Sequence, residues 1–206
     1  MNPEEPLSPR GMDSRFPLVP LAVAFYSVLG MVAVAWRLLV DGQGPFWALA
    51  APEVGRGPEA GLLLWHALLG LLVGGGLIIS SRLWIRSTRM GHVLAQRLAE
   101  ILGPLSGAQV AVLALASGLG EEAFFRGALQ PRVGLALASL LFAMAHLVPR
   151  RELLPWAGFA ALAGVLLGAL FDCTGNLLAP VTAHVLINAV NLHWLSRAST
   201  LRAPKA

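Results

Sequence analysis

Charged side chains and cysteine are scarce in this chain of 206 residues. Only 13% of the residues are charged, Lys205 is the single lysine, and Cys173 is the single cysteine. One cysteine excludes an intrachain disulfide and any metal site built from several cysteines. The basic residues cluster between apolar runs and form no continuous basic face with exposed aromatics, so no nucleic-acid partner is expected.

Apolar residues are abundant instead. They make up 56% of the chain, and the mean hydropathy is +0.69, far above that of an ordinary soluble domain. A helix needs about 20 apolar residues to cross a bilayer. We therefore expect an all-α, polytopic transmembrane helical bundle of about six spans, at residues 16–40, 60–80, 105–129, 133–148, 153–171 and 177–195.

The segments around these spans suggest a domain organisation. The chain divides into an N-terminal tail, two helices with their connection, a four-helix core and a C-terminal tail, at residues 1–15, 16–104, 105–195 and 196–206. The arginine-bearing stretch 82–103 is amphipathic and is expected to lie along the membrane surface, between the second and third spans.

Charge asymmetry predicts the orientation of the spans. With six spans, both termini lie on one side of the membrane, and that side collects most basic residues: Arg10, Arg15, Arg82, Arg86, Arg89, Arg97, Arg150, Arg151, Arg197, Arg202 and Lys205. By the positive-inside rule, that side is cytoplasmic.

Three charges stand inside the expected span 105–129. Each of Glu121, Glu122 and Arg126 costs about 2.5–3.5 kcal/mol at the centre of a membrane helix, so a partner is required. Glu122 and Arg126 are four residues apart and can form an ion pair on one helix face. Glu121 is rotated by about 100° from Glu122 and stays available for another partner. A purely structural helix contact is the alternative interpretation.

The later spans supply further polar side chains. Phe142 and His146 share one helix face, and so do His184 and Asn188, because each pair is four residues apart. Together with Glu121 they provide what peptide hydrolysis needs. A carboxylate and an imidazole can activate water, and polar donors can stabilise the oxyanion of the tetrahedral intermediate.

The depth of these residues tests whether they can meet. Counting about 1.5 Å per residue from the expected outer helix ends places His184 about 10 Å deep, Glu121 about 12 Å and Asn188 about 17 Å. His146 comes out at about 20 Å by the same count. The fourth span must therefore start late, tilt, or follow a submerged turn.

Three motifs follow one another on these apolar segments: Glu121-Glu122-x-x-x-Arg126, Phe142-x-x-x-His146 and His184-x-x-x-Asn188. In this order they resemble the CAAX protease and bacteriocin-processing family of glutamic-type intramembrane endopeptidases. The resemblance covers about residues 105–195 and implies that this segment is the catalytic core.

The resemblance also implies roles for the residues. Glu121, helped by His146, would activate the attacking water, and His184 and Asn188 would stabilise the oxyanion. Glu122, Arg126 and Phe142 would support the site. No cofactor is expected. A glutamate and two histidines are plausible zinc ligands. Zinc is nevertheless the less favoured variant, because no His-Glu-x-x-His helix is present.

Other polar residues are interpreted as structural. Three further histidines join no convergent polar set, namely His66, His92 and His193. Asp172 and Asn176 are expected to cap the last helix. Cys173 lacks an adjacent base and is not expected to be catalytic.

Two other functions fit the same polar cluster. A non-catalytic immunity or regulatory membrane protein could bind a peptide there. A small transporter could use it as a proton relay, but the chain shows no inverted repeat.

The resemblance also suggests the substrate. It implies a membrane-anchored, lipidated or exported precursor protein, cut near its C-terminal tail. If the orientation is right, Glu121 and His184 lie in the outer half of the bilayer, which favours exported precursors. We expect a multi-pass protein of a bacterial inner (cytoplasmic) membrane with both termini in the cytoplasm.

Overall fold

The computed structural model describes residues 18–42 and 60–200, and these ranges are helical with short connections. The tail 1–15 and most of the connection between the first two helices lie outside the described residues. The elements are α1 Leu18–Leu39, α2 Ala60–Ser87, α3 Arg89–Leu102, α4 Gly107–Glu122, η1 Ala123–Leu129, α5 Gln130–Ala145, η2 Arg151–Leu153, α6 Leu154–Thr174 and α7 Leu178–Thr200. The predicted all-α class is confirmed.

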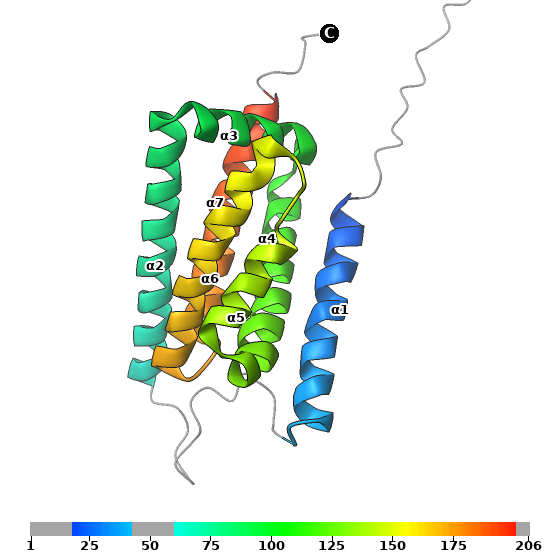
Figure 1. The fold of residues 1–206 in the computed structure, drawn as a ribbon, viewed down its shortest axis with the longest axis vertical. Helices are drawn as coiled ribbons and strands as arrows, with labels where there is room; N and C mark the ends of the chain where they lie inside the picture. Colours follow the sequence, from blue (N-terminus) through cyan, green and yellow to red (C-terminus); the bar gives the residue numbers. More distant parts are fainter. Residues whose placement is uncertain (1–17, 43–59, 201–206) are drawn as a thin grey trace, which may run out of the picture.

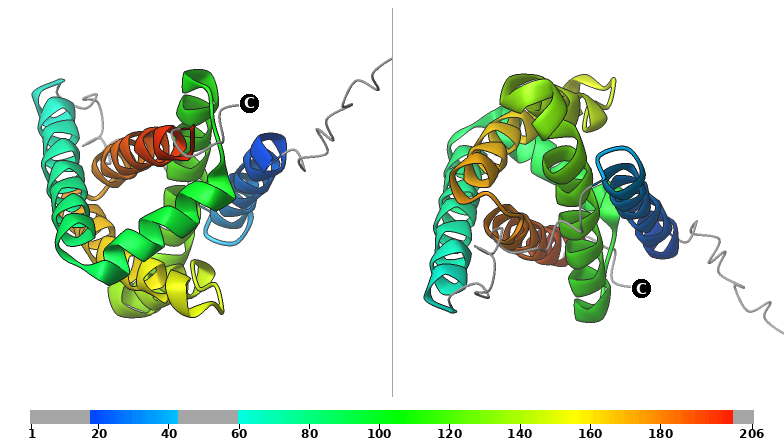
Figure 2. Two further views of the ribbon diagram at one scale, coloured as in Figure 1. Left: turned by 90° about the horizontal axis from the view of Figure 1, so that it is seen from above. Right: turned by 90° about the horizontal axis from the view of Figure 1, so that it is seen from below.

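The long helices run along one another and α3 crosses one end of the bundle (Figure 1). The first residue of α1 and the last turn of α7 both lie at this α3 end. Figure 2 shows α1 on the outside of the bundle, beside α4. The contact is close, because a Cβ atom on Gly30 of α1 would lie 3.7 Å from the Cα atom of Gly120 in α4.

Four segments of the described chain are long and apolar enough to cross a membrane: Leu18–Leu39, Gly61–Ser87, Gly107–Ala145 and Arg151–Thr174. The third contains two of the six expected spans. Helix α7 is not among the four, since polar side chains interrupt it, among them those of His184 and Asn188. The protein is therefore a polytopic helical bundle, and the number of six spans stays a prediction.

The turn between the third and fourth expected spans is not where the sequence suggested. The helical path continues past residue 129 and reverses at Gly134, whose φ of 79° lies in the left-handed region that glycine tolerates. Phe125 and Phe142 show the reversal, because their ring centroids are 5.1 Å apart, whereas a continuous helix would separate them by about 25 Å. Pro131 does not stop the helix because it stands in the first turn of α5.

This shifted turn removes the depth mismatch of His146. Glu121 lies 13 residues before Gly134 and His146 lies 12 residues after it. Two helices that leave one turn in opposite directions bring such residues to the same height. The predicted boundary at 129–133 was wrong, and with the turn at Gly134 the two side chains can meet.

The second helix is also longer than predicted. It continues to Ser87, so Arg82 belongs to the helix and not to a surface stretch. The Arg82 guanidinium lies 3.9 Å from the ring centroid of Trp194 and donates a hydrogen bond to the Val190 carbonyl in α7. The amphipathic segment proper is α3, which begins after the Thr88 cap. Its position on a membrane surface stays a prediction.

Small residues allow close contacts between the helices. A Cβ atom on Gly70 of α2 would collide with the carbonyl oxygen of Ala179 in α7, and a Cβ atom on Gly74 would be in tight contact with the backbone of Ala183. On the other side of the bundle, Gly164 of α6 packs against Ser139 of α5. Close backbone approach of this kind is typical of helices packed in membranes.

Candidate active site

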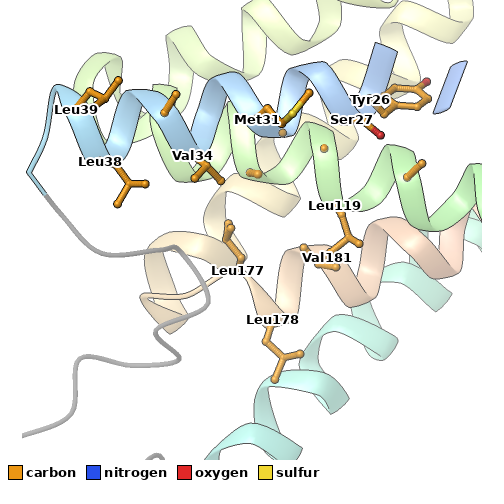
Figure 3. A pocket seen from close by; sticks show the side chains of 15 residues that line it. Tyr26, Ser27, Met31, Val34, Leu38, Leu39, Leu119, Leu177, Leu178 and Val181 are labelled. Carbon is orange, nitrogen blue, oxygen red and sulfur yellow. The ribbon is translucent and has the colours of Figure 1, made fainter. Parts of the chain in front are cut away.

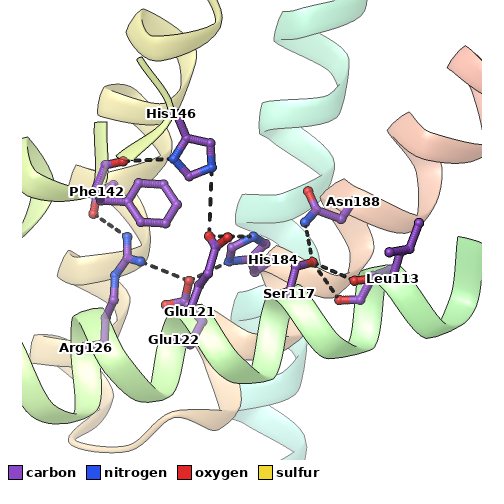
Figure 4. Close-up of polar contacts among 11 residues, drawn as sticks. Leu113, Ser117, Glu121, Glu122, Arg126, Phe142, His146, His184 and Asn188 are labelled. Atoms are coloured by element: carbon purple, nitrogen blue, oxygen red, sulfur yellow. Dashed lines mark hydrogen bonds and ion pairs between the residues drawn. The ribbon is translucent and has the colours of Figure 1, made fainter. Parts of the chain in front are cut away.

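The two glutamates stand at the end of α4, and the arginine stands in the π-helical turn η1 that follows. All three are buried, with exposed fractions of 6% for Glu121, 0% for Glu122 and 1% for Arg126. π-helical turns are rare and frequently occur at functional sites. Figure 4 shows Arg126 facing back toward Glu122.

The ion pair predicted between Glu122 and Arg126 is present. Arg126 Nη1 donates to Glu122 Oε1 at 3.0 Å, and Nη2 donates to the carbonyl of Gly164 at 3.0 Å. The guanidinium also lies 4.5 Å from the ring centroid of Phe142. Hydrogen bonds to both sides and an aromatic face compensate the buried charge of Arg126.

Glu122 has a second partner that the sequence did not reveal. His184 Nδ1 lies 2.6 Å from Glu122 Oε1, the same oxygen that accepts from Arg126. Because an ionised carboxylate only accepts hydrogen bonds, His184 donates its Nδ1–H to Glu122. The hydrogen bond between Glu122 and His184 joins α4 to α7 and fixes the orientation of the imidazole ring.

Glu121 faces the two histidines. Its Oε2 atom lies 3.9 Å from His146 Nε2 and 3.8 Å from His184 Nε2. Both distances exceed a direct hydrogen bond, and Glu121 Oε2 is buried without a hydrogen-bond partner in the described residues. The structure thus brings Glu121, His146 and His184 together from three helices (Figure 4).

Hydrogen bonds determine which ring nitrogens face Glu121 as acceptors. His146 Nδ1 lies 2.8 Å from the carbonyl oxygen of Phe142, and a carbonyl only accepts, so Nδ1 carries the proton. In the neutral rings of His146 and His184, Nε2 therefore carries a lone pair and can accept a hydrogen bond. Three acceptor atoms converge, and a group that donates protons or a cation fits between them.

Asn188 lies beside this cluster, on α7, one turn beyond His184. Its Nδ2 donates to the hydroxyl of Ser117 at 2.8 Å, and that hydroxyl donates to the Leu113 carbonyl at 2.8 Å. Ser117 is 3% exposed and was not singled out in the sequence. A signal was available, because Ser117 precedes Glu121 by four residues and shares its helix face.

The comparisons with known proteins match the segment that carries this cluster. Residues 104–190 match the family model described as type II CAAX prenyl endopeptidase Rce1-like. The resemblance predicted from the motifs is thereby confirmed over this segment. The matched segment contains the whole polar cluster, from Glu121 to Asn188, and leaves out α1, α2 and α3.

A second similarity is to an uncharacterized protein, YpbD, of Bacillus subtilis (strain 168). The two are 40% identical over 93 residues, which make up 44% of this chain and 48% of that protein. The chain therefore spans about half the length of the curated relative that it matches. No solved structure matches the chain.

The donor set of the cluster is compatible in type with zinc. Imidazole nitrogens and a carboxylate oxygen are common zinc ligands, and the hydrogen bonds at both Nδ1 atoms orient the rings as metal-binding histidines are oriented. However, no group of three or more His, Cys, Asp or Glu side chains within the described ranges is arranged to hold a metal. Glu121, His146 and His184 would have to move closer together first.

The polar residues interpreted as structural have ordinary partners. Asn176 Oδ1 accepts from the Leu178 N–H at 3.0 Å and caps α7, and its Nδ2 lies 2.7 Å from His66 Nδ1. Asp172 accepts a hydrogen bond from Gln130 at 2.7 Å and caps no helix. Cys173 is a free, exposed thiol.

Proposed function

We propose that this protein is an intramembrane endopeptidase that hydrolyses a peptide bond near the membrane-embedded or lipidated C-terminal tail of a precursor protein. One observation supports it most directly: Glu121 Oε2 is buried, unpartnered and faced by two imidazole nitrogens. A site of three acceptors suits a water molecule, which can donate two hydrogen bonds and keep its lone pairs for attack.

In the proposed reaction, the water donates to Glu121 Oε2 and His146 Nε2. Its oxygen attacks the peptide carbonyl carbon, and one of its protons passes to Glu121. When the carbon–nitrogen bond breaks, the electron pair goes to the nitrogen, and Glu121 returns the proton to this leaving group. A buried carboxylate at hydrogen-bond reach is suited to both transfers.

The oxyanion of the tetrahedral intermediate needs donors. Asn188 offers its Nδ2–H₂, of which one hydrogen is directed at Ser117 and the other is left for the intermediate. His184 can donate from Nε2 only when its ring is protonated to an imidazolium, and the Nδ1–H of that ring still donates to Glu122. Donors fixed in advance in this way stabilise developing charge effectively.

The metal-free route is the one we propose, and a zinc-dependent route is the less favoured variant. Chelation separates them. Under the metal-free route, a strong chelator leaves the cleavage rate of purified protein unchanged, and a metal assay finds no stoichiometric zinc. Loss of activity with chelator and recovery with added zinc would replace the metal-free route by the zinc route.

The substrate proposal rests on the family match and on the depth of the polar cluster in the membrane. Glu121 lies 14 residues after Gly107, about 21 Å from the α3 end of the bundle, and His184 lies six residues after Leu178, about 9 Å from the opposite end. If the arginine-rich α3 end is cytoplasmic, the cluster lies in the outer half of the membrane. We therefore favour exported precursors with apolar or lipidated C-terminal tails.

The experiment compares cells that carry the wild-type protein with cells that carry Glu121→Gln at equal protein level. We expect membrane-bound precursors that retain apolar C-terminal tails to accumulate in the variant, as measured by mass spectrometry of secreted and membrane proteins. Unchanged precursor levels would contradict proteolysis. Full biological function of the variant would favour a binding protein instead.

A further inference from the structure

Helix α1 lies outside the segment that matches the protease family, yet it reaches the candidate active site. Tyr26, at the middle of α1, is half-buried, packs against Gly120 and lies close enough to Glu121 for the two side chains to interact. Tyr26 is the single tyrosine of the chain. A phenol within an apolar helix is most stable beside a polar group, and the proposed catalytic carboxylate is within its reach.

The backbone contact between the two helices holds Tyr26 at this position. A Cβ atom on Gly120 would collide with the carbonyl oxygen of Tyr26, and Gly30 lies one turn farther along the same contact. The residue next to Gly120 is Glu121. Glycine at position 120 therefore lets α1 approach at the height where a phenol can reach the glutamate.

Tyr26 also lines a large apolar groove. The groove, with a volume of about 880 Å³, lies between α1, α4 and the start of α7. Tyr26 is one of its lining residues, and Figure 3 shows it near Ser27, with Leu38 and Leu39 farther along α1. Tyr26 thus lines the groove and contacts Glu121.

We propose that Tyr26 is a positioning residue for Glu121 and that α1 completes the active site. The phenol donates to the carboxylate of Glu121 and restricts its rotation. The other side of the carboxylate, Oε2, is then directed at His146 and His184, where the water has to be held. This inference rests on the proposed function for its kinetic consequence but not for the contact itself.

The contact is tested first, without any substrate. Full-length protein in detergent micelles, labelled with 3-fluorotyrosine, gives one ¹⁹F resonance because Tyr26 is the single tyrosine. We expect Glu121→Gln to shift this resonance, since a carboxamide replaces the charged acceptor. The control Ser117→Ala changes the same helix one turn away and is expected to leave the resonance in place. A resonance insensitive to Glu121→Gln overturns the proposal.

The role is tested next, with an internally quenched peptide that carries a prenylated CAAX tail. Tyr26→Phe removes the hydroxyl alone, and we expect kcat to fall about tenfold with KM unchanged. The neighbouring control Ser27→Ala should change neither constant. A shifted resonance with wild-type kcat in Tyr26→Phe would overturn positioning. A wild-type protein that cleaves no precursor or peptide, with the resonance still sensitive to Glu121→Gln, would refute the proteolytic function and leave the contact standing.

Discussion

The end cluster and the acid cluster are groups of buried polar side chains in the described part of the bundle, and they differ in whether their hydrogen bonds are complete. The end cluster comprises His66, Thr174 and Asn176, and no buried side-chain nitrogen or oxygen of these residues lacks a partner. The acid cluster comprises Glu121, Glu122, His146 and His184. In it, Oε2 of Glu121 and Oε2 of Glu122 are buried and unpartnered.

This difference indicates that the end cluster stabilises the fold and that the acid cluster carries the chemistry. A buried polar group without a partner costs roughly 1–3 kcal/mol, and more when it is charged. The end cluster avoids that cost and ties α2 to the start of α7. The acid cluster retains that cost at a place where a reacting water or a substrate could supply the missing bonds, which is a common property of functional sites.

The strongest test of this comparison is Glu121→Gln in the acid cluster. The amide keeps the size of the side chain but cannot take a proton from water, so we expect kcat for the prenylated CAAX peptide to fall by about 10²–10⁴-fold. The midpoint of thermal unfolding in detergent serves as the control for folding. Wild-type kcat in this variant would assign the acid cluster to structure as well.

Asn188→Ala is expected to have the next largest effect. Removal of one oxyanion donor typically lowers kcat by about 10²–10³-fold, and KM should change little because the interaction forms in the transition state. Asn191→Ala, the same change three residues farther along α7, is the matched control. Equal effects of the two substitutions would contradict an oxyanion role for Asn188.

Ser117→Ala should have a smaller effect through Asn188. The hydroxyl accepts from Asn188 Nδ2, and the loss of a neutral hydrogen bond corresponds to a decrease of up to about tenfold in kcat. If Ser117 acts by orienting Asn188, the double variant with Asn188→Ala should lose no more activity than Asn188→Ala alone. Additive losses would show that Ser117 acts independently.

The smallest effect on activity is expected in the end cluster. His66→Leu removes the partner of Asn176 Nδ2, which keeps its bond to the Thr174 carbonyl. We expect the unfolding free energy to fall by about 1–3 kcal/mol, while kcat stays within about twofold of wild type. A large loss of kcat at unchanged stability would remove the distinction between the two clusters.

Some parts of the site could be predicted because they are local. The pairing of Glu122 with Arg126 follows from a spacing of four residues in a helix and is present at 3.0 Å. Likewise, the separation of Glu121 from that pair follows from helix geometry. Motif order was sufficient to indicate the family over the segment that its model matches.

Other parts depended on contacts between helices far apart in the chain. The bond from His184 to Glu122 spans 62 residues, and the contact of Tyr26 with Glu121 joins α1 to α4. Apolar patterns do not determine such pairs, because many helix rotations bury an equal apolar area. Gly134 was missed for a related reason: Pro131 is the stronger local signal for a turn, but the first turn of a helix accommodates proline.

The sequence by itself determined that this protein has an apolar, helical body and that a few charges inside it need partners, because both follow from residue type and helix periodicity. Only the tertiary structure decided which partners they have. Helix packing and the turn at Gly134 bring Glu121, His146 and His184 to one height, and they leave a carboxylate oxygen unpartnered between two imidazoles. Distances between separate helices depend on the packing of the whole bundle, which no local pattern encodes.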